Sequence, residues 1–108
     1  MLVELDAFSG RVNPLWQLDA GQEQRVRALQ QGLPERGEPM AEPPGLGYRG
    51  FRYTLDGVPW RAWNGAVAGR GRAFDDPRRT VERLLLELLP TEYAALRERI
   101  TDELEKEN

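Results

Sequence analysis

The chain has 108 residues, of which 40% are hydrophobic, and a formal net charge of −3, a composition typical of one globular domain with a single core. It has no cysteine and no histidine, which excludes disulfides, thiolate metal sites and every mechanism that needs either side chain. Its only lysine, Lys106, lies near the C-terminus, which argues against Schiff-base chemistry.

The charges are distributed unevenly along the chain. Residues 49–83 hold eight arginines against four acidic residues, a net charge of +4, and acidic segments flank them. A basic section of this kind can bind nucleic acid, but more often it pairs with the acidic segments once the chain folds. The start MLVELDAF alternates and carries acids, so it does not resemble a signal peptide, and no apolar run approaches the roughly 20 residues that span a bilayer. With the lack of cysteine, this predicts a cytoplasmic protein without a membrane partner.

The first expected element is a strand over residues 2–8. Its alternation places Val3, Leu5 and Ala7 on one face and Glu4, Asp6 and Phe8 on the other.

The stretch that follows, SGRVNPLW, allows two interpretations. In the first it is a stiff corner, in which Asn13 forms local hydrogen bonds and Trp16 packs under the helices. In the second it is a binding loop in which Ser9, Arg11 and Asn13 contact a partner, with the Arg11 guanidinium clamping a carboxylate or phosphate. Ser9 is not expected to be a nucleophile, because the chain offers it no base.

A helix is expected over residues 20–31. Asp19 and Gln22 match the capping-box pattern at its start, and Gly32 suits the left-handed C′ position at its end. The next segment, residues 33–47, is rich in proline and glycine and is predicted to be a loop.

Residues 48–68 are expected to form a hairpin around Asp56-Gly57, a strong type I′ turn signal. A two-residue loop fixes the register. The apolar face pairs Leu55 with Val58, Tyr53 with Trp60 and Phe51 with Ala62, and the opposite face pairs Thr54 with Pro59, Arg52 with Arg61 and Gly50 with Trp63. Pro59 lacks an N–H group, so the second strand is expected to be an edge there.

Two more helices are expected towards the C-terminus. Asp76 followed by Pro77 predicts the start of a helix over 77–89, whose buried face comprises Val81, Leu84, Leu85, Leu88 and Leu89. After Pro90, a helix over 91–105 carries a stripe of Tyr93, Leu96, Ile100 and Leu104, and residues 106–108 are a frayed tail.

The order β-α-β-β-α-α predicts an α+β fold in a single domain, residues 1–108. We expect a two-layer sandwich with a three-stranded, mainly antiparallel sheet packed against two or three helices.

The outer face of the hairpin is the main candidate site. Arg52 and Arg61 lie opposite each other and repel, so an acidic group is expected near them. That group is either an external phosphate or acidic partner, with Tyr48 and Trp63 as stacking surfaces, or an acidic residue of the first strand. In the second case Glu4 and Asp6 neutralise the two arginines within the chain.

Other motifs are weaker. Trp63 points outward and needs a cover, which is either its own chain or a partner. The GRGRAF segment at 69–74 lacks the spacing of a phosphate-binding loop. Asp75 and Asp76 have the oxygen ligands that magnesium prefers, but Asp76 is used as a helix cap, so no metal or cofactor is predicted.

The FSGRxNPxW pattern of the first 20 residues, with the later GYRGF segment, resembles small uncharacterised bacterial proteins that begin in the same way. No activity is attached to that family, so the resemblance implies a shared fold and no function.

Taken together, the sequence predicts a small cytoplasmic, non-enzymatic module that binds another protein, of an accessory, regulatory or immunity type. The predicted binding residues are Ser9, Arg11, Asn13, Tyr48, Arg52, Arg61 and Trp63, with no catalytic residue. The alternatives are a nucleic-acid-binding domain that uses the arginine and aromatic sheet face, and a carboxylate- or metal-dependent enzyme. The sequence also leaves open whether the chain forms a homodimer.

Overall fold

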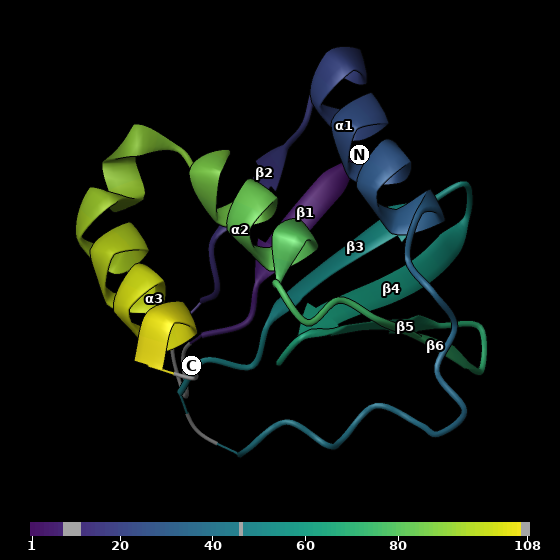
Figure 1. Cartoon of the computed structure of the whole chain (residues 1–108). Helices are drawn as coiled ribbons and strands as arrows, with labels where there is room; N and C mark the ends of the chain where they lie inside the picture. Colours follow the sequence, from purple (N-terminus) through teal and green to yellow (C-terminus); the bar gives the residue numbers. More distant parts are fainter. Residues whose placement is uncertain (8–11, 46, 107–108) are drawn as a thin grey trace.

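The computed structural model describes residues 1–7, 12–45 and 47–106. In these parts of the chain, three α-helices lie over one face of an open, six-stranded antiparallel sheet with the order β2-β1-β3-β4-β5-β6 (Figure 1). The strands are β1 (Leu2–Leu5), β2 (Leu15–Gln17), β3 (Phe51–Leu55), β4 (Val58–Trp63), β5 (Ala66–Gly69) and β6 (Arg72–Asp75). The α+β class is confirmed, whereas the expected three-stranded sheet was too small.

Three two-residue turns build most of this sheet. Each turn has both residues at positive φ, as a type I′ turn requires: Asp56–Gly57 (52° and 78°), Asn64–Gly65 (52° and 77°) and Arg70–Gly71 (54° and 74°). The hairpin expected over 48–68 is therefore corrected: its second strand ends at Trp63, and residues 66–68 belong to β5. The segment considered as a glycine loop is part of the third hairpin.

The register predicted from Asp56-Gly57 is confirmed from the Leu55–Val58 pair to the Phe51–Ala62 pair. The expected edge at Pro59 is wrong, because β4 lies between β3 and β5. Pairing with β5 begins only at Trp60, so Pro59 lies just outside that ladder and its missing N–H removes no bond from it.

The N-terminal hairpin differs from the expected single strand. β1 ends at Leu5 and pairs with β2, a strand of three residues that follows Pro14. Trp16 in β2 is 7% exposed and packs edge-on against Phe51, with ring centroids 6.3 Å apart. The corner interpretation therefore places Trp16 correctly in the core.

The first helix, α1 (Ala20–Gln31), has the predicted bounds and capping box. The Asp19 carboxylate accepts from the Gln22 N–H at 2.8 Å, and the Gln22 side chain accepts from the Asp19 N–H at 3.0 Å. The assignment of Gly32 is corrected: it is the C-cap residue and has a right-handed φ of −86°, so its lack of a side chain is not required there.

The second helix, α2 (Thr80–Glu87), begins three residues later than predicted. Arg79 adopts a left-handed conformation with a φ of 55°, which prevents a helix from starting at Pro77. Asp76 nevertheless accepts from the N–H groups of Thr80 and Val81, both at 3.0 Å, so it still satisfies the helix start.

The chain then passes through Pro90 into a short 3-10 helix (Thr91–Tyr93) and α3 (Ala94–Lys106), where one helix over 91–105 was expected. Lys106 is helical rather than part of a frayed tail.

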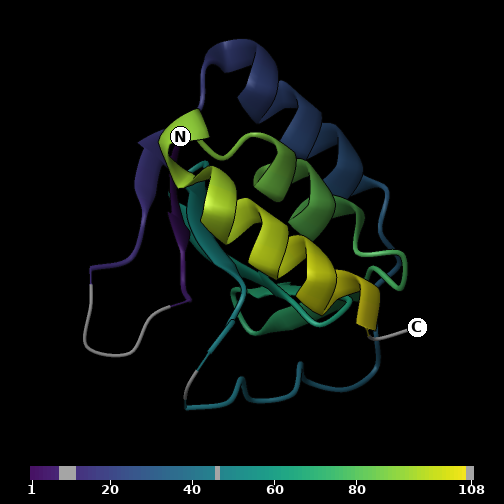
Figure 2. The same cartoon turned by 90° about the vertical axis from the view of Figure 1, so that its left-hand side faces the viewer.

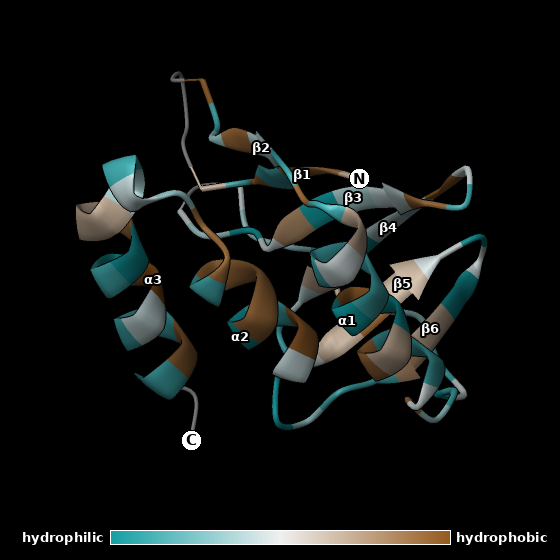
Figure 3. Cartoon of the chain, turned by 90° about the horizontal axis from the view of Figure 1, so that it is seen from above, coloured by the Kyte–Doolittle hydropathy of each residue, from teal (hydrophilic) through white to brown (hydrophobic). Residues whose placement is uncertain are grey.

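Leu88 and Tyr93 are only half-buried, whereas the other residues of the predicted helical stripes are buried: Val81, Leu84, Leu85, Leu89, Leu96, Ile100 and Leu104. The most hydrophobic of the three helices is α2 (Figure 3), and it packs between α1 and α3 over the sheet.

The face of the sheet away from the helices, the outer face, is covered unevenly. The segment 34–43 runs below β5 and β6 (Figures 1 and 2). It is fixed by bonds from the Arg36 N–H to the Ala73 carbonyl (2.9 Å) and from the Asp75 N–H to the Pro34 carbonyl (2.8 Å). The outer face of β1, β2 and β3 has no such cover in the described chain. Across the same ranges, the helices are too short or too polar to cross a membrane.

Candidate functional site

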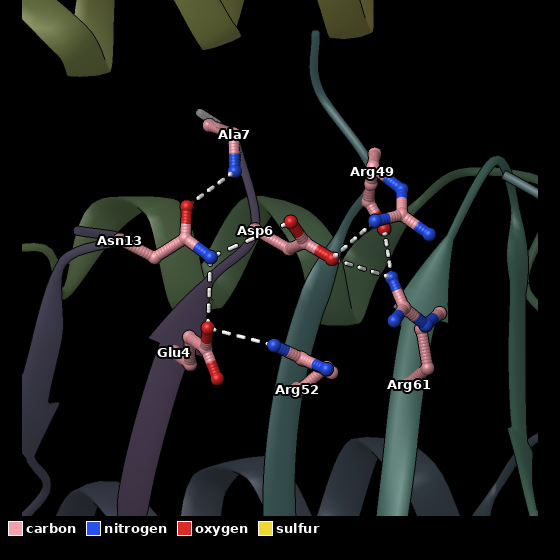
Figure 4. Close-up of polar contacts among 7 residues, drawn as sticks. All are labelled: Glu4, Asp6, Ala7, Asn13, Arg49, Arg52 and Arg61. Atoms are coloured by element: carbon pink, nitrogen blue, oxygen red, sulfur yellow. Dashed lines mark hydrogen bonds and ion pairs between the residues drawn. The ribbon is translucent and has the colours of Figure 1, made fainter. Parts of the chain in front are cut away.

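Six polar residues form a connected network on the outer face, which we call the outer-face network: Glu4, Asp6, Asn13, Arg49, Arg52 and Arg61 (Figure 4). Three of them are predicted binding residues, and two more are the acidic residues expected to neutralise the arginines.

Strand register explains the centre of this network. Glu4 on β1 is paired with Arg52 on β3, which is paired in turn with Arg61 on β4. Because neighbouring residues across a sheet point to the same face, all three side chains project outward. The Arg52 Nη2 group donates to the Glu4 carboxylate at 2.7 Å.

Asp6 holds the other end of the network. Its side chain is buried and accepts from the Nη1 group of Arg61 at 3.2 Å, while the Nη1 group of Arg49 lies 3.6 Å away. The same Arg61 group donates to the Arg49 carbonyl at 2.6 Å. The backbone of Asp6 is bonded to Arg49 and Gly50 on the neighbouring chain segment, so this carboxylate is fixed in place.

Asn13 ties the segment before β2 back to β1. Its amide nitrogen donates to the carboxylates of Glu4 (2.8 Å) and Asp6 (3.5 Å), and its oxygen accepts from the Ala7 N–H (3.2 Å). The expectation that Asn13 bonds locally is met by these contacts, which give the residue a structural role.

The electrostatics of the network favour ionised carboxylates. Burial by itself raises the pKa of Glu4, but hydrogen bonds from Asn13 and Arg52 and the positive charges of Arg52 and Arg61 outweigh it. The net result is a pKa below the ordinary value of a glutamate. Glu4 is therefore charged at neutral pH and partly cancels the arginine charge of this face.

Arg52 and Arg61 thus find their acidic partners within the chain, as one of the two interpretations expected. The two residues differ in exposure, because the side chain of Arg52 is 47% exposed and that of Arg61 is 20% exposed. Arg52 is the arginine of this pair that remains accessible to a partner.

Tyr48 does not lie beside Arg52 as a stacking surface. Its hydroxyl donates to Glu82 on α2 at 2.6 Å, and its ring packs edge-on against Phe51 in the core. The charge pattern of the sequence gave no sign of this contact, so Tyr48 was assigned to the wrong face.

Trp63 points outward and is half-buried, and its own chain supplies part of the cover. Pro39 and Met40 from the segment below the sheet line a hollow on one side of the ring, and Pro44 lines another. The sequence analysis left open whether Trp63 is covered by its own chain or by a partner, and these contacts show cover from its own chain.

Two predicted binding residues, Ser9 and Arg11, lie outside the described residues, so the binding role of this loop stays a prediction.

The two aspartates considered as metal ligands have other partners. Asp75 forms an ion pair with Arg36 at 3.0 Å, and Asp76 binds the first amides of α2. Within residues 1–7, 12–45 and 47–106, no group of three or more acidic, histidine or cysteine side chains is placed to hold a metal ion.

The sequence did not reveal an apolar groove next to the network. Leu2 (47% exposed) and Leu15 (52%) line a groove of about 470 Å³ with Arg52 and Pro59, which we call the outer groove. With Val12 (88%), they are the strongly exposed large hydrophobic residues of the described chain. Alternation around the buried Trp16 was the available signal, since it places Leu15 on the outer face once β2 is recognised.

A buried hydrogen-bonded cluster, missed by the sequence analysis, surrounds the carboxylate of Glu82. This side chain is 1% exposed and accepts from the Tyr48 hydroxyl, the Asn64 N–H (3.3 Å) and the Gly65 N–H (3.0 Å). The Nε group of Arg79 lies 3.9 Å away. Burial, with the negative charge of Glu82, raises the pKa of Tyr48 well above its ordinary value, so the phenol stays protonated and donating. The cluster joins α2 to the turn between β4 and β5.

Comparison of the chain with protein-family models, with curated proteins and with solved structures finds no match. Function therefore has to be inferred from the geometry of the molecule, and the resemblance carried by the FSGRxNPxW pattern stays a prediction.

Proposed function

We propose that this chain is a small, non-enzymatic protein-binding module whose contact surface is the outer groove. The observation that carries the proposal is the position of Leu2 and Leu15, which are both about half exposed on the uncovered part of the sheet beside Arg52. Exposed apolar side chains gathered at one place on a small domain are typical of contact surfaces.

The chemistry of the groove fits a protein partner. Arginine is enriched at protein interfaces, and the buried centre of an interface is more apolar than its rim. Arg52 uses its Nη2 group for Glu4, and the described chain gives its other N–H groups no acceptor. A partner that places an apolar side chain between Leu2 and Leu15, with a carbonyl or carboxylate near Arg52, complements this surface.

The same network gives less support to nucleic acid. Glu4 and Asp6 lie among the arginines of this face, so a phosphate backbone along it meets negative charge as well as positive charge. Enzymatic use of these carboxylates is also poorly supported, because both are held by hydrogen bonds and ion pairs within the fold. The cytoplasm, inferred from the cysteine-free composition, is the proposed location.

Matched variants test the proposal. The wild-type chain, Leu2→Ser, Arg52→Ala and the control Arg99→Ala, an exposed arginine on α3, are immobilised and used to capture proteins from cells of the source organism. The captured proteins are compared by quantitative mass spectrometry. In parallel, each chain is titrated against single- and double-stranded nucleic acid in gel shifts at low and at moderate salt.

The proposal predicts a protein that the wild type and Arg99→Ala retain equally and that Leu2→Ser and Arg52→Ala lose by about tenfold or more. Equal retention by all four chains contradicts it. A gel shift that weakens with salt, that Arg52→Ala abolishes and that Leu2→Ser leaves intact would favour the nucleic-acid-binding alternative over the protein-binding module.

A further inference from the structure

The two edges of the sheet differ in whether their outward backbone groups are paired. The edge at β6 is covered, because the segment 34–36 bonds to its backbone at Ala73 and Asp75. At the opposite edge β2 pairs with β1 on one side, and no described strand or segment pairs with its other side (Figure 1).

The hydrogen-bond pattern shows which groups β2 presents to that open side. The Leu5 N–H donates to the Pro14 carbonyl at 3.0 Å, and the Leu18 N–H donates to the Met1 carbonyl at 2.9 Å. In an antiparallel ladder every second residue bonds to the same neighbour, so Trp16, midway between Pro14 and Leu18, bonds to β1. The N–H and C=O groups of Leu15 and Gln17 therefore point away from the sheet, and both side chains are exposed.

No side chain of this strand protects the open edge, and only its length of three residues limits pairing there. Natural edge strands commonly carry charged residues, above all lysine, or an outward-facing proline. Residues 12–18 (VNPLWQL) contain no charged side chain. Pro14 gives no protection, because its nitrogen faces β1 and not the open side.

We propose that β2 pairs with β2 of a second copy of this chain, antiparallel and with Trp16 at the two-fold axis. In this register Leu15 lies opposite Gln17 of the partner subunit, and the two such pairs exchange four backbone hydrogen bonds. Among the antiparallel registers that pair outward groups, this register alone uses both Leu15 and Gln17 of each strand. The uncharged strand faces itself without like-charge repulsion, which favours a second copy over a charged segment.

The dimer is expected to be weak and reversible, because a three-residue strand buries far less than the roughly 1,200 Å² of a stable interface. The edge shares Leu15 with the outer groove, but it does not include Arg52. Arg52→Ala therefore distinguishes self-pairing from a partner bound in the groove.

A pair of double variants tests this register. Leu15→Lys with Gln17→Lys places two lysines opposite each other at both pairs, whereas Leu15→Lys with Gln17→Glu places a lysine opposite a glutamate. Both variants replace exposed side chains, so their urea midpoints are expected to agree with each other and serve as the folding control. Sedimentation velocity is recorded for these chains, the wild type and Arg52→Ala, up to about 1 mM.

We expect concentration-dependent dimerisation of the wild type and of Arg52→Ala, near-wild-type association of the lysine–glutamate variant, and at least tenfold weaker association of the lysine–lysine variant. The amides of Leu15 and Gln17 are expected to exchange hydrogen more slowly as the concentration rises. A wild type that stays monomeric up to about 1 mM overturns the proposal. Equal association of the two double variants also overturns it, since the contact then lies elsewhere.

Discussion

Glu4 and Glu82 are both glutamates with hydrogen-bonding partners from distant parts of the chain, yet they occupy opposite kinds of environment. The Glu4 side chain is 27% exposed on the outer face, where its partners are Arg52 and Asn13. Glu82, on α2, is 1% exposed, and its partners are Tyr48 and the amides of a turn. One carboxylate borders a surface that another molecule can reach, and the other is sealed inside the fold.

This difference shows why a cluster of charged residues does not by itself identify a binding site. Removing one member of a buried cluster leaves donors without acceptors in a place that water cannot enter, so the cost falls on stability. Removing one member of an exposed network lets water replace it, so the cost falls on whatever the surface binds.

The largest effect is expected for Glu82→Ala. This substitution leaves the Tyr48 hydroxyl and the N–H groups of Asn64 and Gly65 without their acceptor, and it should lower the free energy of unfolding by about 3 kcal/mol or more. Urea denaturation measures this. The control is Glu87→Ala on the same helix, where the side chain is 67% exposed and a change within about 0.5 kcal/mol is expected. Similar losses for both variants would show that Glu82 is not buried as described.

A smaller effect is expected for Gly57→Val, which tests the β3–β4 register that places Arg52 beside Arg61. Gly57 has a φ of 78° with no atom near the added side chain, so the cost is that of a β-branched residue at positive φ, about 1–2 kcal/mol. Gly37→Val, at a loop position with open space and no positive φ, is the control and should cost less. An unchanged melting temperature for Gly57→Val would mean that the hairpin and its face assignments are wrong.

A modest pH effect is expected from Glu4. Its pKa is lower in the folded chain than in the unfolded chain, so its ionisation stabilises the fold fully above the unfolded value of about 4.5. That contribution is lost as the pH falls below 4.5 and through the lowered pKa. Glu4→Gln should therefore flatten the decline in stability below about pH 4.5, by less than about 1 kcal/mol because the pair is partly exposed. Parallel pH profiles for the wild type and Glu4→Gln would contradict the assigned contacts.

Local signals were sufficient for much of the fold. Asp56-Gly57 gave the correct register of β3 and β4, and Asp19 with Gln22 gave the start of α1, because both features depend only on adjacent residues. Asn64-Gly65 carries the same turn signal, so the turn between β4 and β5 was recoverable from the sequence. Arg70-Gly71 is weaker, because arginine seldom adopts positive φ.

Other features depend on contacts that no local pattern contains. Arg79 delays the start of α2 because it adopts a left-handed conformation. Tyr48 turns inward to donate a hydrogen bond to Glu82, which lies 34 residues away in the sequence. The strand β2 has three residues, too few for alternation to distinguish it from a loop. For the same reason the exposure of Leu15, and with it the outer groove, was predictable only once the pairing with β1 was known.

The most direct test of the outer groove as a binding surface is to measure partner retention and the free energy of unfolding together on Arg52→Ala. Because Arg52 is half exposed and its ion pair is solvated, we predict a change in unfolding free energy within about 0.5 kcal/mol, together with at least a tenfold loss of the retained protein. Arg99→Ala should change neither quantity. An Arg52→Ala chain that keeps its partner, or that loses stability as Glu82→Ala does, would contradict the assignment of this face to binding.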